Sequence, residues 1–107
     1  MLKIEGVAMD KFRRINIPTI INKEFPLDNH AYITTNENGC ICVYRENNNS
    51  LYLSETGVHN FSGDKNIRRL VIPINFLSCN TFYFGNKVTI ILFEDHIELW
   101  PYKSEEG

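Results

Sequence analysis

The chain has 107 residues and a net charge of −2, with 43% hydrophobic and 12% aromatic residues. This length suits one domain with its own core, and no apolar run approaches the ~20 residues of a membrane span. Residues 1–5 lack the apolar centre of a signal peptide, so we expect a cytoplasmic protein. The three cysteines are an odd number, which favours reduced thiols packed as small apolar residues.

The first elements expected are two strands and a short helix. Leu2 and Ile4 alternate with polar residues, which predicts an opening strand. Residues 10–18 then read Asp-Lys-Phe-Arg-Arg-Ile-Asn-Ile-Pro, a basic turn followed by a second alternating stretch. Proline suits the first turn of a helix, where its missing N–H costs nothing, so we expect one or two helical turns over residues 19–25.

A β-hairpin is predicted next. Residues 31–35 and 39–44 are rich in β-branched and aromatic residues, and the Asn-Glu-Asn-Gly sequence between them is typical of a turn. The polar segment that follows is rich in asparagine and favours a linker, which we place at residues 46–55.

The chain then repeats its first phrase. Residues 64–73 read Asp-Lys-Asn-Ile-Arg-Arg-Leu-Val-Ile-Pro, and Gly-Val precedes both copies. A second short helix is expected over 74–79 and a second hairpin over 87–93 and 96–100. We therefore interpret the chain as a single domain, 1–107, of two repeated halves, 1–45 and 56–103. Such short strands, with one helix in each half, predict a mainly β fold with short helices, closed as a small barrel or sandwich.

Positive charge gathers in the two repeated phrases, while the segments between them are acidic. Such a concentration attracts an anionic partner even when the net charge is negative. Arginine suits this role because its planar fork grips a phosphate or a guanine edge with two hydrogen bonds. Six of the eleven Lys and Arg residues belong to these phrases: Lys11, Arg13, Arg14, Lys65, Arg68 and Arg69.

These motifs resemble a known family. The run Arg-aliphatic-x-Ile-Pro, a short helix and a β-hairpin are together similar to the swapped-hairpin AbrB-type DNA-binding fold. Two copies in one chain resemble its MraZ branch of bacterial transcriptional regulators. The match is carried by the Asp-x-x-x-Arg signature at residues 10–14, by the strand at 38–44 and by the last strand at 97–100. The resemblance implies a pseudo-symmetric double AbrB-like swapped-hairpin β-barrel.

The resemblance also implies a function. It predicts a nucleoid-associated, sequence-specific regulator that binds operator-like double-stranded DNA and forms a homo-oligomer, a dimer or larger. The six basic residues of the two phrases would contact the DNA, while Asp10 and Asp64 would orient the turns. An alternative is that both aspartates pair with the arginines and only pin the turns. The family usually carries glycine at the positions of Arg13 and Arg68, because the turn there requires a positive φ.

Another class of function stays open. The family usually carries a helical segment after each hairpin, and these segments are missing or reduced to residues 45–56 and 101–107 here. These reduced helices, the acidic net charge and the missing turn glycines also suit a protein-binding module, either antitoxin-like or a divergent relative that lost DNA binding. The sequence shows no catalytic or phosphate-binding motif, so we expect no enzyme activity, cofactor, metal, membrane or small-molecule substrate. The one metal arrangement left open pairs Cys40 or Cys42 with a distant histidine. The aromatic run at 82–84 is expected to contribute to a subunit interface.

Overall fold

The computed structural model describes residues 2–47, 52–61, 64–78 and 86–102, with only the backbone of residues 61, 64–66, 77 and 78. Both predicted hairpins and both short helices are present. Neither described helix is long and apolar enough to span a membrane. The elements in chain order are β1 (Leu2–Ala8), β2 (Arg14–Ile17), α1 (Thr19–Glu24), β3 (His30–Thr35), β4 (Ile41–Tyr44), β5 (Ser54–Phe61), β6 (Asp64–Val71), α2 (Ile74–Ser78), β7 (Lys87–Leu92) and β8 (Ile97–Pro101).

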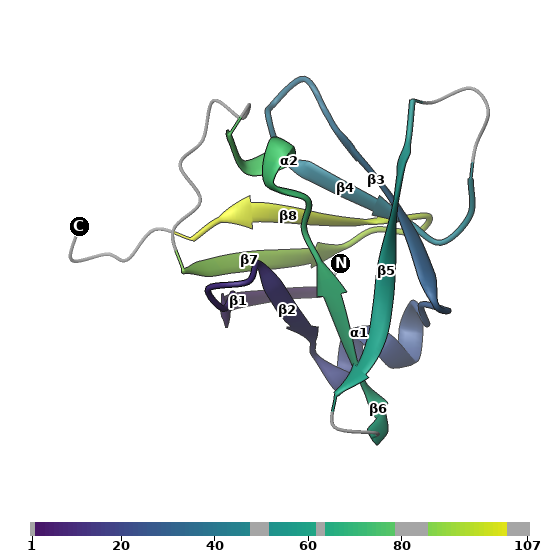
Figure 1. Cartoon of the computed structure of the whole chain (residues 1–107). Coiled ribbons are helices and arrows are strands. Elements are labelled where there is room, and N and C mark those ends of the chain that lie inside the picture. Colours follow the sequence, from purple (N-terminus) through teal and green to yellow (C-terminus); the bar gives the residue numbers. More distant parts are fainter. Residues whose placement is uncertain (1, 48–51, 62–63, 79–85, 103–107) are drawn as a thin grey trace.

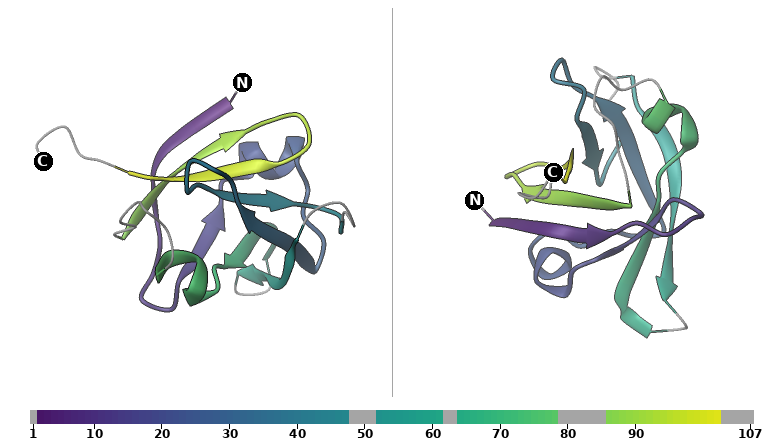
Figure 2. Two further views of the ribbon diagram at one scale, coloured as in Figure 1. Left: turned by 90° about the horizontal axis from the view of Figure 1, so that it is seen from above. Right: turned by 90° about the vertical axis from the view of Figure 1, so that its left-hand side faces the viewer.

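The eight strands pair antiparallel in one sheet, in the order β1-β7-β8-β4-β3-β5-β6-β2. The two end strands approach each other through the bridge between Met9 and Ile15, so the sheet curls into a nearly closed barrel. Strands β5 and β6 cross β7 and β8 steeply in Figure 1, and the views of Figure 2 follow the sheet around the barrel. The prediction of a mainly β fold with short helices is confirmed.

The core fills the barrel because apolar and polar residues alternate along the strands. In β2, Ile15 and Ile17 are buried while Asn16 between them is exposed. Helix α1 adds Ile21, and Phe25 follows it with its N–H donating to the Ile21 carbonyl at 2.8 Å. The largest fully buried side chains are Phe25, Ile15, Ile21, Ile33, Ile41, Leu70, Ile72, Ile90, Ile97, Leu99, Val43 and Val88.

The turn between β3 and β4 forms for the reason that the sequence predicts. The side-chain oxygen of Asn36 accepts hydrogen bonds from the N–H groups of Asn38 and Cys40, both at 3.0 Å. Gly39 has a φ of 80°, which glycine adopts without a steric penalty. The N–H of Gly39 donates to the Asn36 carbonyl at 2.9 Å and closes the turn.

The second repeated phrase differs from its prediction. Residues 64–71 form the strand β6, which pairs with β5 on one side and with β2 on the other, instead of a basic turn. One extra residue separates its acid from its second arginine, so the local geometry that closes residues 10–14 is not repeated. Strand β5 also begins at Ser54, within the expected linker. The aromatic run at 82–84 lies outside the described residues.

Candidate nucleic-acid interface

Asp10 organises the basic turn between β1 and β2. Its Oδ1 accepts hydrogen bonds from the backbone N–H groups of Phe12 and Arg14, both at 2.9 Å, and its Oδ2 accepts one from Arg14 Nε at 2.7 Å. Desolvation alone would raise the pKa of this carboxyl, but the hydrogen bonds from Arg14 and Phe12 outweigh it and lower the pKa. The predicted pairing of Asp10 with an arginine is therefore present, and it fixes the direction of Arg14.

Arg13 takes a backbone conformation that glycine adopts most readily. Its φ is 63°, in the left-handed region that L residues rarely adopt. Two contacts to the end of β6 hold it there: its Nε–H donates to the carbonyl of Ile72 at 3.1 Å, and the N–H of Ile72 donates to its carbonyl at 2.9 Å. The left-handed turn is thus held with arginine at this position, and the Nε of Arg13 is engaged within the protein.

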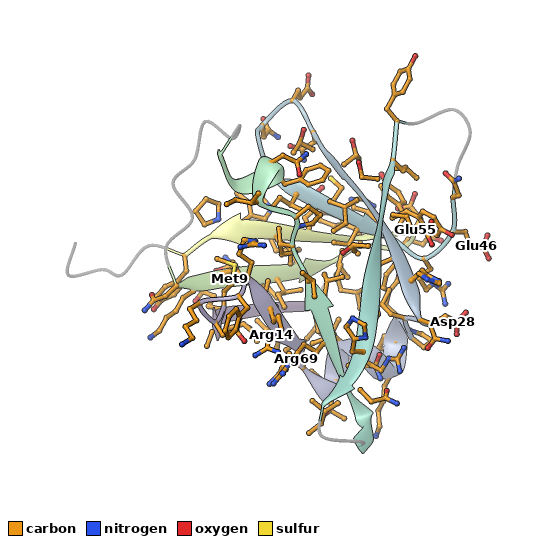
Figure 3. The ribbon with its side chains drawn as sticks, viewed as in Figure 1. Met9, Arg14, Asp28, Glu46, Glu55 and Arg69 are labelled. Atoms are coloured by element: carbon orange, nitrogen blue, oxygen red, sulfur yellow. The ribbon has the colours of Figure 1, made fainter. Side chains whose placement is uncertain are left out.

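The pairing of β2 with β6 brings Arg14 and Arg69 together from the two phrases. Arg14 lies opposite Val71, and Asn16 lies opposite Arg69. Arg14 and Asn16 share the outer face of β2, because residues two apart on a strand point to the same side. The Nε–H of Arg69 donates to the side-chain oxygen of Asn16 at 3.0 Å, and Figure 3 shows Arg14 and Arg69 close together.

An exposed aromatic ring extends this surface across the turn. Phe12 is 55% exposed, with Lys11 Nζ 5.2 Å and the guanidinium carbon of Arg14 5.0 Å from the ring centre. These are cation–π distances, so the ring holds both cations near one place. We call this surface the arginine face; it consists of Lys11, Phe12, Arg14, Asn16 and Arg69.

Arg68 does not belong to the arginine face. It precedes Arg69 on β6, so the two side chains point to opposite faces of the strand. The guanidinium of Arg68 donates hydrogen bonds to the Asn60 side chain and to the carbonyl of Asp28. Its Nε is buried and has no hydrogen-bond partner in the described part of the chain. Arg68 therefore ties β6 to β5 and to the loop before β3. The side chains of Asp64 and Lys65, both predicted as site residues, lie outside the described residues.

Acidic side chains lie elsewhere on the molecule. Figure 3 shows Asp28, Glu46 and Glu55 on a different side from Arg14 and Arg69. Beside the arginine face, the carboxylate of Asp10 is engaged by the Arg14 Nε–H and by two backbone N–H groups. The other three acids thus lie apart from Arg14 and Arg69.

A cluster of Cys42, His96 and Glu98 lies where β4 meets β8. The sequence left open the pairing of Cys42 with a distant histidine but did not indicate Glu98. Cys42 pairs directly with Glu98, and His96 precedes β8 on the same outer side as Glu98. One ligand atom from each of the three residues lies within 4.8 Å of the other two. The signal available in the sequence was the likeness of segments 39–44 and 95–100, which become neighbouring strands.

A groove crosses the outer side of β1, β7 and β8. Its volume is about 530 Å³, and its walls combine aromatic, aliphatic and charged side chains. A groove of this mixed character could accommodate an extended peptide. It is lined by Lys3, Glu5, Thr89, Ile91, Trp100, Pro101 and Tyr102.

Comparison with known proteins does not assign the chain to a family. No family model matches the chain, and no curated protein matches its sequence. The arginine face is therefore interpreted from its own residues.

Proposed function

We propose that the protein is a sequence-specific DNA-binding regulator of transcription that uses the arginine face. The observation that carries this proposal is the register of β2 and β6, in which Arg14 and Arg69 lie on one outer face although 55 residues separate them. A compact basic surface on a chain of negative net charge is the electrostatic footprint of a nucleic-acid partner.

We also propose that the barrel consists of two interlocked AbrB-like halves. Exchanging β1 with β5, β2 with β6, β3 with β7 and β4 with β8 leaves the order around the barrel unchanged. The register agrees, because Ile15 pairs with Leu70, and these residues hold the same place in the two phrases. Strand β1 pairs with β7 and strand β5 with β3, as expected when the halves exchange hairpins.

The arginine face suggests how DNA would be contacted. Strands β2 and β6 belong to the barrel wall, since β6 pairs with β5 as well as with β2, so side chains on their outer face would reach the DNA. The Nε of Arg14 is engaged by Asp10, while its two terminal nitrogens carry no hydrogen bond to any residue that the structure describes. They are the donors that would reach a base edge or a phosphate, and Lys11 would contact the backbone. Both terminal nitrogens of Arg68 are engaged internally, so we now assign Arg68 to the fold instead of the interface. Arg13, like Arg14, has its Nε engaged, and it stays a candidate contact.

One barrel offers few contacts, so useful affinity requires several copies that read repeated sites. We therefore propose a homo-oligomer, a dimer or larger, acting in a bacterial cytoplasm on operator-like double-stranded DNA. No catalytic step is part of this proposal.

The test is a gel shift on the DNA upstream of the protein's own coding sequence, repeated across a series of salt concentrations. We expect a shift whose affinity falls steeply as salt rises, because bound phosphates release counterions. No shift on this DNA, or on DNA recovered by selection from random sequences, would contradict the proposal.

The second candidate is a protein-binding module, and the groove beside Trp100 and Tyr102 favours it. It predicts no DNA shift and a specific protein that copurifies with the chain. Substituting Trp100 with alanine should then abolish copurification, while Arg14→Ala should leave it intact.

A further inference from the structure

His96 lies in a small polar cluster under aromatic cover. Its ring stacks on Phe93, with centres 4.9 Å apart and planes 7° apart, and on Tyr44, with centres 5.1 Å apart. Its side chain is only 16% exposed, and that of Glu98 only 13%. Cys42, opposite Glu98 on β4, is buried as well. Three side chains that can bind a metal ion therefore lie together, largely shielded from solvent, on the outer side of the sheet.

Neighbouring side chains determine which atoms of His96 and Glu98 point into this cluster. Asp95 Oδ1 lies 2.6 Å from His96 Nδ1 and Glu98 Oε2 lies 3.0 Å from Nε2, so the two ring nitrogens have separate carboxylate partners. The indole N–H of Trp100 donates to Glu98 Oε1 at 3.0 Å, which leaves Oε2 directed toward Nε2. A histidine held by a carboxylate on one nitrogen presents the other nitrogen in the orientation typical of zinc ligands.

We propose that Cys42, His96 and Glu98 form a binding site for a zinc-class divalent metal ion, with Asp95 and Trp100 as positioning residues. The ligand atoms would be the Cys42 sulfur, His96 Nε2 and Glu98 Oε2, with a solvent molecule completing four-coordination. A mixture of sulfur, nitrogen and oxygen donors suits Zn²⁺ or Co²⁺ and excludes Mg²⁺ and Ca²⁺, which require oxygen ligands.

The charges of the ligands suit a divalent ion. Binding deprotonates the Cys42 thiol, and the two positive charges of the ion match the resulting thiolate and the Glu98 carboxylate. Since Cys42 and Glu98 belong to paired strands far apart in sequence, the ion would link the two halves of the chain.

The experiment titrates Co²⁺ and Zn²⁺ alone into the purified, metal-stripped chain. We expect one equivalent of Co²⁺ to produce a thiolate-to-cobalt charge-transfer band, and excess Zn²⁺ to remove it. Zn²⁺ should also raise the melting temperature in a concentration-dependent way, because only the folded chain holds the site. The same titrations compare Cys42→Ala with Cys40→Ala, which removes the other buried cysteine of this segment but no proposed ligand. A Cys79→Ser variant controls for the third thiol, whose position lies outside the described residues.

The proposal predicts that Cys42→Ala loses the charge-transfer band and the zinc-dependent stabilisation, while Cys40→Ala and Cys79→Ser keep both. Asp95→Asn should keep the band but weaken zinc affinity by roughly 10- to 100-fold, as loss of such a positioning carboxylate does in other zinc sites. If Cys42→Ala fails to fold, as judged by circular dichroism, His96→Gln supplies the same comparison. A parent chain that shows no band and no zinc-dependent stabilisation would overturn the proposal, as would a band that depends on Cys79.

Discussion

Arg13 holds a backbone conformation that an L residue adopts at a cost, and its surroundings explain why it stays there. Its φ of 63° is costly by roughly 1–2 kcal/mol for a residue with a Cβ. Hydrogen bonds to both polar backbone atoms of Ile72 oppose that cost. Beside it, Asp10 satisfies two backbone N–H groups and the side chain of Arg14. The turn that presents Arg14 is thus fixed by side-chain chemistry and not by a glycine.

The first prediction compares glycine and alanine at position 13. Both substitutions remove the bond from Nε to Ile72, but only glycine relieves the left-handed backbone. Arg13→Gly should therefore be more stable than Arg13→Ala by about 1 kcal/mol, as measured by urea unfolding. The same pair of substitutions at Asn16, in the middle of β2, should show the opposite order. Equal stability of the two variants at position 13 would contradict the account of the turn.

The second prediction concerns Asp10 and acid. Its pKa is lowered in the folded chain, so its stabilising effect is complete above its unfolded value of about 3.8 and is lost as pH falls through the lower, folded value. Asp10→Asn should lower the melting temperature at neutral pH. Between neutral pH and about pH 3, the melting temperature of this variant should fall less than that of the parent. Glu37→Gln, an exposed acid of the β3–β4 turn, is the matched control. Identical pH profiles for the two variants would argue against a special role for Asp10.

At the scale of elements, the pairing of β2 with β6 joins the two repeated phrases and carries the arginine face. Ile15 and Leu70 lie opposite each other, and both are fully buried in the core. The outer residues of the same strands are polar or half-exposed. Stability and the proposed interface therefore depend on opposite faces of one pair of strands.

The third prediction follows from this arrangement. Ile15→Ala and Leu70→Ala should each lower the free energy of unfolding by about 2–5 kcal/mol, because each leaves a cavity in the core. The double variant should depart from additivity by about 0.5–3 kcal/mol, since the two side chains are neighbours. Ile20→Ala on the exposed side of α1 should change stability by less than about 0.5 kcal/mol. Strict additivity of the two core substitutions would contradict the register.

Local chemistry explains which elements the sequence predicts. The Asn-rich turn before Gly39, the prolines before both helices and the Asp10 turn each contain the groups that form them, so short-range reasoning finds them. The conformation of the second phrase depends on distant partners, because β6 forms a strand by pairing with β5 and β2. The partners of Arg68 could not be predicted for the same reason, since Asp28 and Asn60 come from other elements. The Cys42–Glu98 pair arises only when the barrel closes.

At the scale of the whole molecule, the barrel presents one arginine face, so a single copy would have a small footprint for DNA. The fourth prediction is that the chain forms a homo-oligomer, with a dimer as the simplest state. Light scattering at micromolar concentration should give a mass of at least twice that of the 12.5 kDa chain. A monomeric mass across that range would contradict the proposed assembly.

The central claim is that Arg14 and Arg69 bind DNA, and the salt dependence of binding tests it most directly. The measurement compares the parent with Arg14→Ala/Arg69→Ala, and with Lys3→Ala/Arg45→Ala, which removes the same charge outside the arginine face. The account predicts that the first double variant folds normally and binds selected DNA more weakly. Each lost phosphate contact should reduce the salt slope by about 0.9, and a lost base contact should cost roughly 1–3 kcal/mol and relax the sequence preference. The control should bind nearly as the parent does. If the Arg14→Ala/Arg69→Ala chain folds and binds its best DNA as tightly as the parent, the arginine face is not the DNA interface.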